Sequence, residues 1–215
     1  MTINYNRSIA TSNLMMCIDV SNPRCYSGSG TTLYDATGNG YNGTLVNGPT
    51  YSSSYGGVIQ TDGVNDYIEV TNLNLSASSY TLIGAARYTT TGGRMINARY
   101  NNWLMGHWNY STENYYAEGW VSSVGSGASD TNWRIYAATW NSSSDSASMY
   151  VNGVVTAGPN TSASAGPNGI GIGGYIPGSS EWSAGQFGFL LAYNTVLTSD
   201  QINQVFNAYR GRYGI

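Results

Sequence analysis

Hydrophobic and polar residues alternate with a period of two along most of the chain. The clearest examples are residues 66–70, 134–140 and 187–193. Because successive side chains of a β-strand point to opposite faces, this alternation predicts strands of antiparallel sheets. In the third stretch the bulky side chains occupy alternate positions, which predicts that one strand face is formed by Phe187, Phe189, Leu191 and Tyr193. Aromatic residues on both faces of several strands indicate a sheet with one face in the core and the other partly covered.

Asparagine–glycine pairs mark turns between the predicted strands. Asn152 and Gly153 separate two short apolar runs, and both residues tolerate the positive φ of a two-residue type I′ hairpin. Asn47 and Gly48 precede Pro49, which cannot donate to a strand ladder and so predicts a turn at a loop or sheet edge. The other loops are rich in glycine and serine, and none resembles a linker between domains. We therefore predict one domain over residues 13–215, with residues 1–12 forming an N-terminal arm or an edge strand.

One helix is predicted near the C-terminus. Thr198 and Gln201 form the pattern of a capping box, and an apolar stripe at helical spacing follows, made of Ile202, Val205, Phe206 and Tyr209. Arg210 suits the last turn, and Gly211 suits the residue after the helix. Many short strands with one terminal helix predict an all-β fold: a two-sheet antiparallel jelly-roll β-sandwich with one short C-terminal helix.

Composition narrows the function classes. Charged residues make up 9% of the 215 residues, the eight basic residues are all arginine, and the formal net charge is −3. Nucleic-acid binding needs clustered basic residues, so no nucleic-acid partner is expected. No apolar run approaches the ~20 residues of a membrane helix, so no membrane insertion is expected. The 41% hydrophobic and 13% aromatic residues favour a folded core over disorder.

The N-terminal region and the cysteines bear on the cellular compartment. Residues 1–10 lack the apolar core and cleavage pattern of a signal peptide. Cys17 and Cys25 are too few for a disulfide framework and do not form a metal-binding or redox pair. Two alternatives remain open for them, namely free thiols or one bridge in an oxidising setting.

Aromatic residues concentrate in the middle of the chain. Residues 100–110 and 114–120 carry three tryptophans and four tyrosines, and we predict a hairpin between them that turns at residues 111–113. Flat aromatic faces stack on sugars, and neighbouring polar side chains supply directional hydrogen bonds. The segment thus predicts a glycan-binding site, for which the candidate residues are Trp103, His107, Asn109, Tyr115 and Glu118. The alternative is that one face of this hairpin belongs to the core.

The acidic residues argue against catalysis. A retaining glycosidase needs two carboxyl groups about 5 Å apart, and the four glutamates are widely spread. Glu113 and Glu118 flank the predicted turn and are the one pair that could meet across strands. His107 is the single histidine, and no nucleophile elbow accompanies it. We therefore predict that the protein is not an enzyme.

Two groups of oxygen-bearing side chains are candidates for calcium. Asp35 and Asn39 form one group, and Asp62 and Asp66 form the other. Calcium prefers six to eight oxygen ligands, and neither group supplies a full set. Asp and Asn also cap turns through their own backbone, which is the alternative for both groups. The sequence predicts no required cofactor and leaves Ca²⁺ as an optional ligand.

Several stretches, taken in order, carry a family resemblance. They are residues 17–23, 29–35 and 38–45, then the Asp-Gly-x-Asn-Asp-Tyr pattern at 62–67, the Trp133 to Trp140 stretch with Tyr-Val-Asn-Gly at 150–153, and finally residues 185–193 with 197–202. Together they resemble laminin-G-like, concanavalin A-like lectin domains with a jelly-roll fold. Residues 207–214 are similar to versions found in tailed-phage virion proteins. The family includes lectins, adhesion modules, glycosidases and virion proteins, so the fold leaves function open.

The resemblance and the composition together suggest a function. We predict a non-enzymatic phage virion structural protein, either a capsid decoration or a tail-associated surface protein, which binds polysaccharide. The expected partners are capsid shell or tail proteins and a host or environmental polysaccharide, with a homo-oligomer as a further alternative. The expected location is the virion surface, after synthesis in the host cytoplasm. The alternative is a free-standing bacterial carbohydrate-binding or adhesion module.

Overall fold

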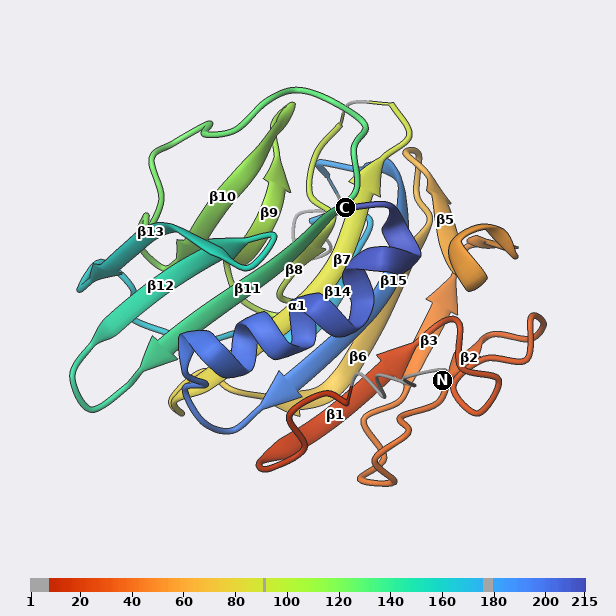
Figure 1. The fold of residues 1–215 in the computed structure, drawn as a ribbon. Coiled ribbons are helices and arrows are strands. Elements are labelled where there is room, and N and C mark those ends of the chain that lie inside the picture. Colours follow the sequence, from red (N-terminus) through yellow and green to blue (C-terminus); the bar gives the residue numbers. More distant parts are fainter. Residues whose placement is uncertain (1–7, 91, 176–179) are drawn as a thin grey trace, which may run out of the picture.

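Two antiparallel β-sheets lie face to face, and one helix crosses the outside of one of them (Figure 1). This computed structural model describes residues 8–90, 92–175 and 180–215. Within that part, the strands alternate between the two sheets along much of the chain, and all pairings are antiparallel. The prediction of an all-β, two-sheet sandwich with one C-terminal helix is confirmed.

The first sheet, sheet A, lies beneath the helix. Its strands run in the order β13 (Val154–Asn160), β12 (Ser146–Val151), β11 (Arg134–Asn141), β7 (Tyr80–Tyr88), β15 (Ala184–Tyr193), β5 (Val58–Asp62) and β4 (Thr50–Ser52), and β1 (Leu14–Asp19) also pairs with β15. A short 3-10 helix, η1 (Ser54–Gly56), joins β4 to β5. The long strands β7, β11 and β15 are therefore central, which agrees with their nearly continuous apolar sequence.

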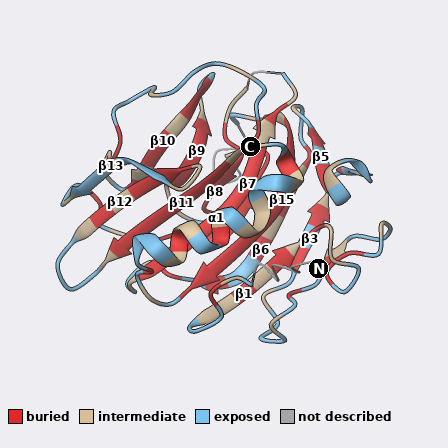
Figure 2. Ribbon diagram, viewed as in Figure 1, coloured by how far each residue is buried: buried red, intermediate tan, exposed pale blue. Residues whose placement is uncertain are grey.

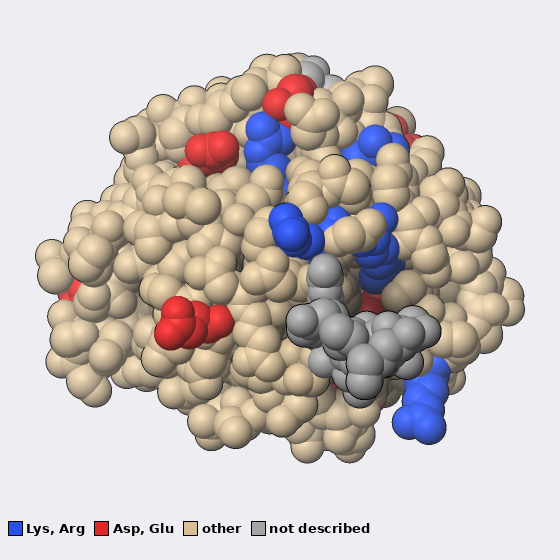
Figure 3. Space-filling model, viewed as in Figure 1, with Lys and Arg blue, Asp and Glu red and all other residues tan. Residues whose placement is uncertain are grey.

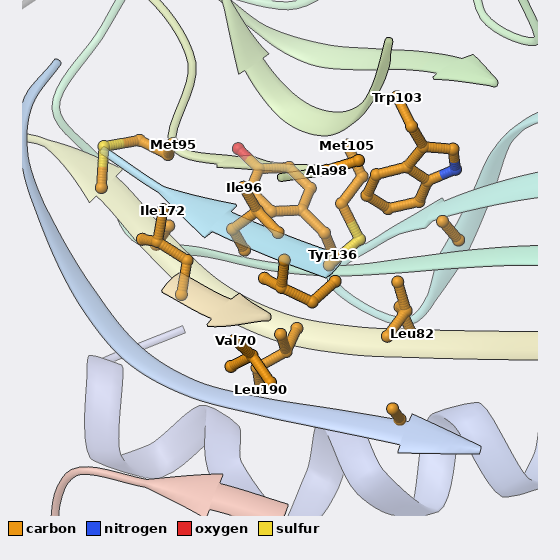
Figure 4. Close-up of a cluster of buried hydrophobic side chains, with 14 of the residues drawn as sticks. Val70, Leu82, Met95, Ile96, Ala98, Trp103, Met105, Tyr136, Ile172 and Leu190 are labelled. Atoms are coloured by element: carbon orange, nitrogen blue, oxygen red, sulfur yellow. The ribbon is translucent and has the colours of Figure 1, made fainter. Parts of the chain in front are cut away.

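The second sheet, sheet B, packs against the opposite face of sheet A. Its order is β10 (Ser111–Ala117), β9 (Trp103–Trp108), β8 (Ile96–Asn97), β14 (Asn168–Ile172), β6 (Tyr67–Asn74), β3 (Gly43–Val46) and β2 (Thr32–Leu33). Side chains of both sheets interdigitate in the core between them, including Met105 and Ile172 from sheet B and Leu82 and Leu190 from sheet A (Figure 4). Figure 2 shows the same division, with buried residues along the strands and exposed ones in the loops.

A second apolar cluster lies between sheet A and helix α1 (Ser199–Tyr213). Ile202 and Val205 of the helix pack on this outer face, where Ile83 and Leu191 are also buried. Sheet A is thus covered on both sides, which explains why its central strands carry large side chains on both faces. This arrangement fits the expectation of a partly covered sheet.

Strand β15 differs from the regular alternation that the sequence predicts. Its register shifts between Phe187 and Phe189, so Phe187 lies in the core between the sheets while Phe189 faces helix α1. The prediction that these two residues share a face was therefore wrong. Gly188 lies at the shift, where a Cβ would overlap the Tyr213 hydroxyl. At the same point β15 changes its neighbour from β5 to β1.

The local signals at turns and helix ends are largely confirmed. Asn152 and Gly153 have φ of 52° and 82° between β12 and β13. Both reciprocal hydrogen bonds of the capping box between Thr198 and Gln201 are present. The helix, however, continues through Gly211 to Tyr213, and Gly214 takes the left-handed conformation instead. Tertiary contacts of the last turn explain this extension, since Arg212 pairs with Asp19 of β1 at 2.6 Å.

The remaining sequence predictions about the chain ends and cysteines have these outcomes. Ala10 packs against β15 and its carbonyl accepts from the Tyr193 hydroxyl at 2.9 Å; residues 1–7 of the predicted arm lie outside the described part. Cys17 and Cys25 are free thiols.

No helix in the described residues is long and apolar enough to cross a membrane. Charged side chains are sparse on the face in Figure 3, where basic ones surround the C-terminal end of α1.

Candidate functional site

The aromatic hairpin forms from β9 and β10, but its turn lies earlier than residues 111–113. Asn109 and Tyr110 form the turn, and both have positive φ, at 45° and 66°. Trp108 therefore lies opposite Ser111, and Trp103 lies opposite Ala117. This register decides which aromatic side chains point between the sheets and which point outward.

Trp103 and Tyr115, two of the predicted glycan-binding residues, belong to the core. Both are fully buried, and they surround Tyr80 of sheet A. The Trp103 Nε1 donates to the Tyr80 hydroxyl at 2.8 Å, and the hydroxyls of Tyr80 and Tyr115 are 2.7 Å apart. A ligand in solvent cannot reach these rings. Their role is to link the two sheets through a buried hydrogen-bond network.

His107 is also buried and lies between two tyrosine rings. The ring centroids of Tyr88 and Tyr136 are 4.3 and 5.4 Å from that of His107, both edge to face. Burial, aided by the positive charge of Arg134, lowers the pKa of His107 to about 3, so the ring is neutral at physiological pH. Within the described residues, its Nε2 has no hydrogen-bond partner. His107 was predicted to contact a glycan, but it lies in the core, where a ligand in solvent does not reach it.

The two other predicted glycan-binding residues, Asn109 and Glu118, are exposed but lie at opposite ends of the hairpin. Asn109 is in the turn, whereas Glu118 follows β10 and accepts a hydrogen bond from the Asn102 amide at 3.1 Å. The structure therefore does not bring the five predicted residues together. Of the five, Asn109 lines the pocket beside the hairpin turn.

That pocket has a volume of about 590 Å³ and opens beside the turn between β9 and β10. Three loops complete it: the one after β5, the segment after β7 and the segment before β15. Its lining residues are Gly63, Gly92, Gly93, Trp108, Asn109, Tyr110, Glu181 and Trp182. The pocket thus combines aromatic rings, backbone polar groups and a single carboxylate.

Backbone hydrogen bonds hold the walls of the pocket together. The amide of Gly93 donates to the Trp182 carbonyl at 3.2 Å, and the amide of Tyr110 donates to the Gly92 carbonyl at 3.1 Å. The buried Tyr88 hydroxyl lies 3.0 and 2.6 Å from the carbonyls of Gly92 and Gly93. A Cβ at Gly93 would overlap the Glu181 carbonyl. Glycine is therefore required where these two segments approach each other.

Glu181 is the polar centre of the pocket. One carboxylate oxygen pairs with Arg94 Nε, and the other accepts from Trp108 Nε1 at 3.3 Å. Arg94 in turn donates from Nη1 to Asn102 Oδ1 at 2.8 Å, and its guanidinium lies 4.1 Å from the ring centroid of Tyr175. The carboxylate is consequently held in one orientation while part of it faces solvent.

Aromatic rings continue the pocket on both sides. Trp120 lies 5.1 Å from both Trp108 and Tyr116, measured between ring centroids. On the other side, Trp182 stacks on Tyr67 at 6.0 Å. We call these partly exposed residues the aromatic surface: Tyr67, Trp108, Tyr116, Trp120 and Trp182. Tyr110, 57% exposed, stands at the rim.

Sequence reasoning identified the segment that holds Trp108 and Tyr110 but missed the contribution of Arg94, Glu181 and Trp182. Arg94 is 87 positions before Glu181, which directly precedes Trp182. A glutamate directly before a tryptophan, in a loop of small residues, is the one local signal that could have indicated them.

The carboxylate pair considered for catalysis does not meet. Glu113 lies within β10, with Oε1 3.9 Å from Arg134 Nε, whereas Glu118 follows the end of the same strand. Five residues of extended strand separate them by about 16 Å. Glycosidases need about 5–9.5 Å between their carboxyl groups, so this pair does not form the dyad. The reason is that both glutamates follow the hairpin turn on the same side, so they do not face each other across two strands.

Asp35 and Asn39, proposed for calcium, make hydrogen bonds within the protein. The Asp35 carboxylate accepts from the backbone amides of Cys17 at 2.9 Å, Thr37 at 3.0 Å and Tyr41 at 3.3 Å. Asn39 donates to the Met15 carbonyl at 2.8 Å. These contacts attach the loop to β1 and correspond to the turn alternative.

Asp62 and Asp66 have different environments. The Asp62 carboxylate accepts from the amides of Val64, Asn65 and Asp66 at 2.8–3.4 Å, and these bonds lower its pKa. Burial and the nearby Asp62 charge raise the pKa of Asp66. In the described part of the chain, no group of three or more His, Cys, Asp or Glu residues could hold a metal. Calcium binding stays a prediction at both places.

No protein-family model and no curated protein sequence matches this chain. Among solved structures, the chain is similar to Trypanosoma rangeli sialidase in complex with sialic acid, with a TM-score of 0.70, 15% identity, and coverage of 93% of this chain and 33% of that one. The binding domain of Paraclostridial Mosquitocidal Protein 1 gives a TM-score of 0.66 at 15% identity, over 92% of this chain and 52% of that one.

A third solved structure matches almost over its whole length. Domain 4 of AbnA, a GH43 extracellular arabinanase from Geobacillus stearothermophilus, in complex with arabinotriose, gives a TM-score of 0.62 at 18% identity. The match covers 90% of this chain and 98% of that one, whereas the chain spans about a third of the sialidase. At these identities the likeness shows the fold alone, a two-sheet antiparallel β-sandwich.

Proposed function

We propose that this protein is a non-catalytic carbohydrate-binding module, which binds a polysaccharide at the pocket and along the aromatic surface. The observation that carries the proposal is the arrangement around Glu181, where an oriented carboxylate lines the same pocket as the partly exposed Trp108 and Trp182. Aromatic rings can stack on the apolar faces of sugars while the carboxylate accepts hydrogen bonds from their hydroxyls. The fold it shares with domain 4 of AbnA, solved with arabinotriose, supports this proposal.

The proposal of a binding role without catalysis rests on the acidic groups. Glu181 is the one acidic residue among those that line the pocket in the described part of the chain. Its charge is engaged with Arg94. Hydrolysis of a glycosidic bond uses a pair of carboxyl groups in two different protonation states, and the pocket supplies one.

Of the two functions predicted from the sequence, the carbohydrate-binding module has more support than the phage virion protein. The structures named above include a binding domain and a domain in complex with a sugar. None of them is a virion protein. A virion location, with capsid or tail partners, stays a prediction from the sequence resemblance.

A glycan panel followed by calorimetric titration tests the proposal. The wild type is expected to bind at least one polysaccharide, and Trp108→Ala is expected to weaken that binding tenfold or more, which corresponds to about 1.4 kcal/mol. Tyr34→Ala is the matched control, because Tyr34 is 56% exposed and does not line the pocket. Equal losses in the two variants, or no binding by the wild type to any glycan, would contradict the proposal.

A further inference from the structure

The charges around the pocket bear on the kind of sugar that it accepts. Arg94 is the basic residue next to the pocket, and it is 6% exposed. Its Nε is paired with Glu181, its Nη1 donates to Asn102, and its flat face is covered by Tyr175. A bidentate ion pair with a ligand carboxylate needs two free guanidinium nitrogens on one edge. Arg94 does not present such an edge to the pocket.

Among the described residues, other basic side chains do not supply the missing charge. The chain contains no lysine, and none of the described residues that line the pocket is basic. Arg99 pairs with Glu69 at 2.6 Å, and Arg87 donates to Gln186 over the rings of Tyr55 and Trp133. The residues at 91 and 176–179, next in sequence to Gly92 and Tyr175, are uncharged.

Negative charge, in contrast, is present at the pocket. Glu181 lines it, and 35% of its side chain is exposed. Asp62 directly precedes the lining residue Gly63, and three backbone amides hold its carboxylate in the ionised form. An anionic ligand would lose hydration without gaining a free cationic partner, because Glu181 already pairs with Arg94. The Asp62 carboxylate, one residue from the lining, would in addition repel it. Sugar hydroxyls can instead donate to Glu181 and to backbone carbonyls.

From these contacts we infer that the pocket selects uncharged sugars and rejects those that carry a carboxylate, such as uronic and sialic acids. This selectivity rests on the proposed function, since it concerns the same pocket. Glu181 and Asp62 are the specificity-determining residues.

The test uses one glycan in three chemical forms. The neutral polysaccharide that binds best in the panel is compared with the same polymer after oxidation of its primary hydroxyls to carboxylates, and with the methyl ester of that oxidised polymer. The carboxylate form is expected to bind at least tenfold more weakly at low salt, with a smaller difference in 0.5 M NaCl because salt screens the repulsion. The methyl ester is expected to recover most of the affinity, since it keeps the added atoms without the charge.

Two variants assign the effect to its residues. Asp62→Asn keeps an oxygen that can accept from the three amides and removes the charge, so it is expected to reduce the discrimination at least twofold. Glu181→Gln removes the ion pair and releases Arg94, and it is expected to reduce the discrimination further. Arg94 is buried, so the loss of its partner in Glu181→Gln would leave an unpaired charge in the fold. If this variant does not fold, binding of the three polymers by the wild type and by Asp62→Asn is sufficient to test the charge selectivity.

The outcomes distinguish the two proposals. Equal or tighter binding of the carboxylate form by the wild type would overturn the selectivity and leave carbohydrate binding intact. Discrimination that stays unchanged in Asp62→Asn and in high salt would also overturn it, because the effect would then be steric. Absence of binding to every glycan would refute the proposed function, and the selectivity with it.

Discussion

Acidification is expected to destabilise this protein through a single buried side chain, His107. The ring is fully buried between Tyr88 and Tyr136, and its pKa is lowered from 6.5 to about 3, chiefly by loss of hydration and secondly by the charge of Arg134. The unfolded chain therefore takes up a proton at a higher pH than the folded protein does. Stability is complete above pH 6.5 and is lost progressively as the pH falls toward 3.

The size of the effect follows from the two pKa values. Between pH 7.5 and pH 4.5, a group with pKa 6.5 in the unfolded chain and about 3 in the fold reduces the free energy of unfolding by about 2.7 kcal/mol. Asp130, whose pKa the Arg134 hydrogen bond lowers to about 2, loses its stabilising effect only below pH 4. Asp62, whose pKa is also lowered, belongs to the same lower range. The interval from pH 6.5 to 4.5 thus lies above the titration of these two carboxyl groups. Asp66, whose pKa is raised, acts with the opposite sign, because the folded form takes up its proton at a higher pH than the unfolded chain, and so offsets part of the loss at the acid end.

Urea denaturation at pH 7.5, 5.5 and 4.5 measures this effect, with His107→Phe as the comparison. Phenylalanine keeps an aromatic ring of similar size between the two tyrosines and does not titrate. We expect the wild type to lose about 2.7 kcal/mol over this interval and the variant to lose much less. A wild type whose stability does not change, or a variant that loses as much as the wild type, would refute the reasoning.

Three further predictions concern the helix, the aromatic surface and calcium. Thr198→Ala removes the capping hydrogen bond to Gln201 and is expected to reduce the free energy of unfolding by about 1 kcal/mol, measured by urea denaturation; an unchanged midpoint would contradict it. Trp120→Ala is expected to weaken binding of a long oligosaccharide at least threefold while changing binding of its monosaccharide little, because Trp120 lies beyond the pocket lining; equal losses in calorimetry would show that the surface does not extend the site. A chelator is expected to leave the melting temperature unchanged, because the Asp35 carboxylate already accepts protein hydrogen bonds; a clear fall would reveal a structural ion.

The candidate site shows where prediction from sequence ends. The aromatic hairpin was predicted from its residues, but its turn lies earlier than predicted, at Asn109 and Tyr110. Which face enters the core depends on the sheet that packs against it, and Tyr80 and Tyr136, which contact Trp103 and His107, come from distant strands. Trp108 and Glu181 meet only because the segment before β15 lies across the end of β9. No local pattern contains that contact.

Local structure is predictable from the order of residues alone: the alternating strands, the Asn152-Gly153 hairpin and the capping box at Thr198. These features depend on backbone conformations and hydrogen bonds between residues close in the chain, so nearby residues are sufficient to specify them. Three features depend on tertiary contacts: the register shift at Gly188, the extension of the helix to Tyr213, and the set of residues that line the pocket. Each of these features depends on close packing between segments far apart in sequence. In such packing, the side chains of one segment limit the size and position of the side chains that the other segment can place against them.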